Sequence, residues 1–121
     1  MELNLVEWLQ ATENRRADLE SYGRSKLPFD IGERHVDMDK AIESTDDAGR
    51  LLADAESYLS HEKAQAMFDV LKDEDLSAKE REIAIKDRVR MTQRIVDGIK
   101  VTVRTLNNRI YAIMNANRSR L

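Results

Sequence analysis

The fold is decided by residues 77–121, which read SAKEREIAIKDRVRMTQRIVDGIKVTVRTLNNRIYAIMNANRSRL. Ser77 followed three residues later by Glu80 is a capping-box pattern, in which the serine hydroxyl accepts a hydrogen bond from the Glu80 amide at the start of a helix. No proline follows. The stretch therefore predicts one continuous helix from 77 to about 120, roughly 65 Å long.

A stripe of residues, all apolar except Thr92, runs along this predicted helix in alternating steps of four and three. A repeat of 3.5 residues keeps one face toward a partner helix over a long distance, as in a coiled coil. We call this stripe the seam. Its members are Ile85, Val89, Thr92, Val96, Ile99, Val103, Leu106, Ile110 and Ile113.

The seam is longer than the remaining helices of one small chain are expected to cover. We therefore expect self-association, with a homodimer as first choice, through the later part of the seam. The predicted oligomer interface comprises Val96, Ile99, Val103, Leu106, Ile110 and Ile113.

The composition favours an all-α protein with a single domain. The 121 residues are 36% charged and 5% aromatic, with one proline and no cysteine. A sheet protein would need more β-branched and aromatic runs and more turn residues. We expect a short helix over 5–22, a loop over 23–35, and helices over 36–72 and 77–120. The short turn after residue 72 predicts a long antiparallel hairpin in an oligomeric bundle.

The ends of the first two helices carry their own signals. Gly23 is placed to end the first helix, and Asp37 or Asp39 could cap the second. Alanines along the second helix would let a neighbouring helix approach closely. In the loop, Leu27, Phe29 and Ile31 alternate with other residues, which fits an extended tether packed on a helix; a peptide-binding groove is the alternative.

Charge is divided unevenly along the chain. Residues 1–76 hold 9 Lys and Arg against 19 Asp and Glu, whereas residues 77–121 hold 11 against 4. The net charges are therefore −10 and +7. Such a division can mean that the basic part binds nucleic acid, or that the two parts attract each other within a chain or between chains.

The basic last helix carries the strongest functional signal. Arginine offers a rigid fork suited to phosphate, and a tyrosine offers a surface on which a base can stack. The alternative is a solvated face, or one paired with acidic residues of the same chain. The candidate nucleic-acid-binding residues are Arg94, Lys100, Arg104, Arg109, Tyr111, Arg118 and Arg120.

No motif predicts catalysis, a metal or a cofactor. His61 begins a sequence one residue short of the zinc pattern His-Glu-x-x-His, because Gln65 stands where the second histidine is needed. The acidic run from Asp69 to Asp75 lacks the central glycine of a calcium-binding loop. No glycine-rich phosphate loop is present. We expect no catalytic residue, no metal and no cofactor, and a protein that is not an enzyme.

The chain carries no pattern typical of membrane insertion or secretion. No apolar run approaches the ~20 residues needed to cross a bilayer, and the start lacks a basic segment followed by an apolar one. We expect a soluble cytoplasmic protein without a membrane partner.

Residues 48–121 resemble small, all-helical proteins that bacteriophages encode near early or recombination genes. The resemblance is carried by Tyr58-Leu59, by Lys63-Ala64, by the entry Leu76 to Glu82 and by the ending Asn117 to Arg120. It implies an accessory role in the host cytoplasm, around DNA, and supplies no catalytic residues.

Two functional hypotheses follow. In the first, the protein is a non-enzymatic accessory factor that binds nucleic acid without sequence preference through its basic helix. In the second, it is an interaction or assembly module with a protein partner, forming a helical oligomer without binding nucleic acid.

Overall fold

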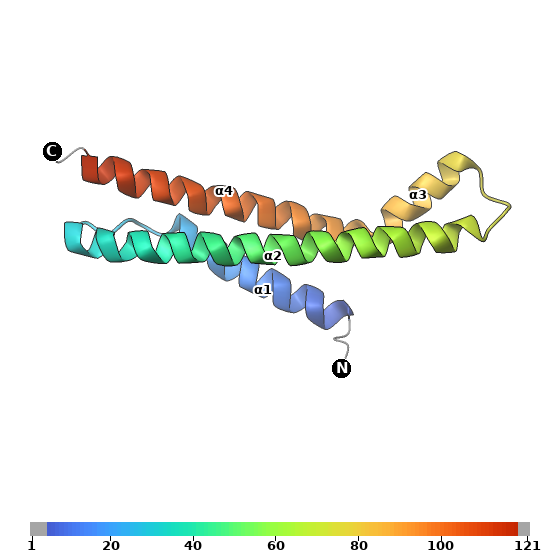
Figure 1. The fold of residues 1–121 in the computed structure, drawn as a ribbon, viewed down its shortest axis with the longest axis horizontal. Coiled ribbons are helices and arrows are strands. Elements are labelled where there is room, and N and C mark those ends of the chain that lie inside the picture. The colour runs from blue at the N-terminus through green and yellow to red at the C-terminus, as the bar shows by residue number, and fades with distance from the viewer. Residues whose placement is uncertain (1–4, 119–121) are drawn as a thin grey trace.

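The computed structural model describes residues 5–118, and within that range the chain is all α-helical, as predicted. The helices are α1 (Leu5–Arg24), α2 (Ile31–Leu71), α3 (Ala78–Arg88) and α4 (Arg90–Arg118). The longest, α2, runs the length of the molecule; α4 lies antiparallel along it, and α1 lies obliquely against the middle of the pair (Figure 1). Among the described residues, no helix is long and apolar enough to cross a membrane.

The start of the hairpin's second half follows the predicted capping pattern, but the helix beyond it is broken. The Ser77 hydroxyl accepts from the Glu80 amide at 3.1 Å. The prediction of one helix from 77 to 120 is wrong at Val89, whose φ of −99° and ψ of 6° separate α3 from α4. At this bend Val89 is buried against the core, and Arg88 binds Asp69 of α2 at 2.5 Å. Tertiary packing therefore bends the chain where neither proline nor glycine marks a break.

The loop between α1 and α2 is shorter than the predicted 23–35. Asp30 caps α2 through a hydrogen bond from the Glu33 amide at 3.1 Å, so α2 begins five residues before the predicted start. The predicted caps Asp37 and Asp39 lie inside the helix. Gly23 does not end α1 but lies within it, with negative φ. It permits a close approach instead, because a Cβ atom there would lie 2.9 Å from Thr105 Cγ2.

The seam is confirmed as the inner face of α4. Thr92, Val96, Ile99, Leu106 and Ile113 are each 1% exposed or less. The predicted small residues of α2 face them: the buried alanines on this helix are Ala41, Ala48, Ala55 and Ala66, spaced by 7, 7 and 11 residues. Alanine has no side chain beyond Cβ, so the α2 and α4 backbones can approach closely.

The interface prediction needs correction because α1 and α2 already cover the seam. Of the six residues predicted for self-association, Val96, Ile99, Leu106 and Ile113 are buried inside a single chain, and Val103 and Ile110 are half-buried. The four buried residues cannot meet a second copy without unfolding. The ring of Trp8 stacks on Tyr58 at a centroid distance of 4.6 Å, which anchors α1 to α2 and closes this core.

Candidate nucleic-acid interface

The outer face of α4 presents a row of cationic side chains. Lys100, Arg104 and Arg118 are exposed, and within residues 5–118 none of the three takes part in an ion pair. Steps of 4 and 14 residues place them on one face of a helix. Tyr111, seven residues after Arg104, lies on the same face and is 63% exposed. We call Lys100, Arg104, Tyr111 and Arg118 the basic face.

Neutral polar residues accompany the basic face, and acids do not. Asp97 is the last acidic residue of the chain. The exposed asparagines Asn107, Asn108 and Asn115 follow it on α4 and provide hydrogen-bond donors and acceptors. The outer surface of the helix beyond Asp97 therefore has no carboxylate of its own to neutralise its cations.

The basic face points away from α1. On α4, α1 contacts Thr102 through Arg16, at 3.4 Å, and Thr105 through Glu20, at 3.1 Å. With 3.6 residues per turn, Lys100 lies about 160° around the helix from Thr102. The carboxylates that α1 holds against α4 are therefore on the opposite side from Lys100.

Arg109 was predicted to bind nucleic acid, and the structure contradicts this. Its side chain is 3% exposed and pairs with Asp37 of α2, Nε and Nη2 each lying 3.0 Å from Asp37 Oδ2. The remaining terminal nitrogen, Nη1, donates to the carbonyl oxygens of Tyr22 at 3.0 Å and Ser25 at 2.6 Å. These partners take four of the five N–H donors of the guanidinium, and a side chain this deeply buried cannot reach a phosphate. Arg109 is a structural residue that ties α4 to α2 and to the end of α1.

Tyr22 completes this buried polar cluster. Its hydroxyl donates to Asp37 Oδ1 at 2.7 Å, and its ring centroid lies 4.5 Å from the Arg109 guanidinium. Burial, followed by the bond to Asp37, raises the pKa of Tyr22 to about 12. The phenol therefore stays protonated over the physiological range and acts as a hydrogen-bond donor to Asp37.

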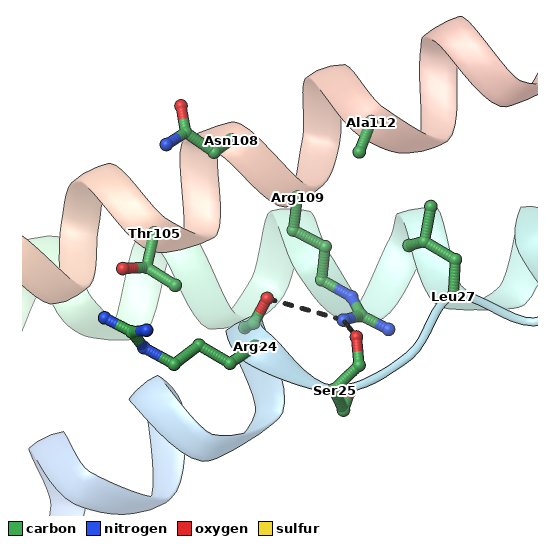
Figure 2. A pocket seen from close by; sticks show the side chains of 8 residues that line it. Arg24, Ser25, Leu27, Thr105, Asn108, Arg109 and Ala112 are labelled. Atoms are coloured by element: carbon green, nitrogen blue, oxygen red, sulfur yellow. Dashed lines mark hydrogen bonds between the residues drawn. The ribbon is translucent and has the colours of Figure 1, made fainter.

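A pocket of about 390 Å³ opens beside Arg109, between the end of α1 and α4 (Figure 2). Its wall includes Arg24, Ser25, Thr105 and Asn108, and Figure 2 shows Arg109 turned toward the Ser25 carbonyl. Arg24 pairs with Glu20 at 3.3 Å. The two arginines are thus already engaged by protein groups, so the pocket's chemistry is that of a polar cleft at a helix junction.

The other predicted residues fall in different places. Arg94 is exposed but lies nearer the joint between α3 and α4 than the basic face does. Arg120 lies outside the described residues. His61 is exposed on α2, and among residues 5–118 no group of three or more histidine, aspartate or glutamate side chains is arranged to hold a metal ion.

Sequence reasoning did not identify Asp37 and Tyr22 as the buried partners of Arg109. One signal for Arg109 was available: it stands three residues after Leu106 and four before Ile113, which is the spacing of the inner face. A cation at such a position needs a buried partner. Nothing in the local pattern indicates which residue that partner is.

This chain was compared with protein families, curated proteins and solved structures. No family model, no curated protein and no solved structure matches this chain.

Proposed function

We propose that the protein is a non-enzymatic accessory factor that binds the phosphate backbone of nucleic acid through the basic face of α4. The observation that carries the proposal is the row of exposed, unpaired cations on a helix surface that has no acid after Asp97. Each phosphate contact releases counterions, so the affinity should fall steeply with salt. An accessory role around DNA is also what the resemblance to bacteriophage proteins implies.

The dimensions of the basic face suit a backbone-binding surface. From Lys100 to Arg118 the helix rises about 27 Å, the length of about eight phosphate steps along one strand of a duplex. Arginines and a lysine along one helix face can follow phosphates without reading bases. Tyr111 adds one stacking surface, which favours single strands over duplex. We expect binding without sequence preference, and a modest affinity because the whole chain carries a charge of −3.

The test removes the charges without touching the core. In Lys100→Gln/Arg104→Gln/Arg118→Gln, helicity should be unchanged because all three side chains are exposed. The slope of log affinity against log salt should fall by about two to three units, measured by anisotropy of a labelled oligonucleotide between about 50 and 200 mM salt.

A matched control separates the basic face from net charge. Lys26→Gln/Arg50→Gln/Lys79→Gln removes the same charge from exposed positions on the loop, α2 and α3. Equal losses in the two triple variants would mean that overall charge, not the basic face, governs binding. Absence of any binding to single- or double-stranded DNA or RNA at low salt would remove the proposal.

A second candidate function is supported by a different surface. On α2, Ala64, Met67, Phe68 and Leu71 are all exposed and follow the spacing i, i+3, i+4, i+7 of a helix-packing stripe. Phe68 is 59% exposed. Such a stripe fits an assembly module that packs against a helix of a second copy or of a protein partner. If it forms a homodimer, Phe68→Glu should reduce the mass measured by light scattering to the monomer's 14.0 kDa.

A further inference from the structure

A second pocket lies where α3 meets α4. It has a volume of about 440 Å³ and is lined by residues of three helices. Lys63 comes from α2, Lys86 from α3, and Arg90, Gln93 and Arg94 from α4, with Val89 at the bend between the last two. We call it the joint pocket. The bend at Val89 is what allows side chains of α3 and α4 to converge on one space.

The joint pocket combines an apolar wall with four cations. The stems of lysine and arginine present methylene groups while their charged heads stay in water. Together with Val89, these stems form a surface suited to a flat apolar ring. Four positive heads around one space of this size favour an anionic ligand. Sites for small molecules fall in the same range of volume, with mostly apolar walls and a few polar groups that fix orientation.

The cations of the joint pocket can exchange their present partners for a ligand with little loss of folding stability. Lys86 pairs with Glu82, and Arg90 pairs with Asp87, but all four of these side chains are more than 60% exposed. Exposed ion pairs contribute little to stability. Within the described part of the chain, Lys63 takes part in no ion pair, and the same holds for Arg94.

We infer that the joint pocket binds one nucleotide unit of a single strand, with the base against the apolar wall and the phosphate on the cations. The inference rests on the proposed function and extends it, since one α4 residue that lines the pocket, Gln93, lies on the same side of the helix as the basic face. Gln93 precedes Lys100 by seven residues, which places both on one helix face. A strand whose nucleotide occupies the pocket can continue along Lys100 and Arg104. Asp97 lies between them and is held by Gln93 at 3.0 Å.

The test uses three small probes on the full chain: a 5′-mononucleotide, the matching nucleoside and inorganic phosphate. Calorimetry should give the mononucleotide the highest affinity, because only it fills both parts of the pocket. Lys63→Gln/Arg90→Gln should weaken mononucleotide binding by about tenfold or more, since hydrogen bonds to charged groups are the strong ones. Lys26→Gln/Arg50→Gln is the control of equal charge and should leave it unchanged. Circular dichroism verifies that each variant is folded.

The outcomes separate this inference from the proposed function. Phosphate binding as tight as the mononucleotide's would overturn it, and so would full mononucleotide affinity in Lys63→Gln/Arg90→Gln. Oligonucleotide binding that depends on Lys100, Arg104 and Arg118 in a protein that takes no mononucleotide refutes the joint pocket and leaves the basic face standing. Mononucleotide binding in a protein that does not bind oligonucleotides removes the basic face, and it overturns the placement of a strand in the joint pocket.

Discussion

Arg109→Leu tests most directly whether this cation belongs to the core or to a binding surface. Leucine removes both contacts to Asp37 Oδ2 and the three contacts to backbone carbonyls, while keeping an apolar stem of similar length. Asp37, itself 8% exposed, then keeps only the Tyr22 hydroxyl as its side-chain partner. Breaking a buried ion pair on one side costs about 3–5 kcal/mol, because a charge is left without compensation.

That loss is large for a chain of this size. Domains are stable by about 5–15 kcal/mol, so at least about a fifth of the total would disappear. The midpoint of thermal unfolding should fall by about 10–20 °C. Urea unfolding followed by circular dichroism, with Trp8 fluorescence as a second probe, measures the change. Arg104→Leu, on the exposed face of the same helix, should stay within about 0.5 kcal/mol of the parent.

A double-mutant cycle assigns the loss to the pair. With Asp37→Asn, no unpaired charge remains when Arg109 is removed, so the double variant should lose clearly less than the sum of the two single variants. If Arg109→Leu unfolds within about 1 kcal/mol of the parent while binding nucleic acid less well, the burial argued for this side chain is refuted, and Arg109 belongs to the binding surface.

Two glycines and one tyrosine give further predictions. Gly49→Ala should stabilise the protein by about 1 kcal/mol in urea unfolding, because it removes a flexible residue from α2 and its new methyl meets nothing within 4 Å. Gly23→Ala should destabilise it, because the same methyl lies 2.9 Å from Thr105 Cγ2; equal effects of the two substitutions would contradict the packing of α1 on α4. The raised pKa of Tyr22, about 12 against about 10 when unfolded, stabilises the fold fully below pH 10. That contribution, up to about 2–3 kcal/mol, should be lost as the pH rises from about 10 to 12, and Tyr22→Phe should flatten the loss.

The helices and the inner face of α4 were predictable because both depend on the spacing of apolar residues that are close together in the sequence. The steps of three and four through Val96, Ile99 and Leu106 need only one helix and one apolar side. The cap at Asp30 was missed although Asp30 and Glu33 have the spacing of a capping box. Alternating Leu27, Phe29 and Ile31 suggested an extended loop instead, and that interpretation concealed the helix start.

The partner of Arg109 and the break at Val89 were not predictable from local pattern. Arg109 and Asp37 are 72 residues apart, and only the antiparallel packing of α2 and α4 brings them together. The interface prediction failed for a related reason. The length of the seam shows how much apolar surface must be covered, but not that α1 and α2 of the same chain cover it.

The two faces of α4 therefore differ in role: the inner face packs against the rest of the chain, and the outer face is exposed to solvent. This difference determines which residues are available to a partner. The inner face, including Arg109, is engaged by α1 and α2, so substitutions there change stability first and report on binding only through unfolding. On the outer face, Lys100, Arg104 and Arg118 form no ion pair within residues 5–118, so their charges can be removed at little cost to folding. Cations that a fold does not use for itself, on the part of a helix that follows its last acid, Asp97, are the residues most available to a partner that carries phosphate.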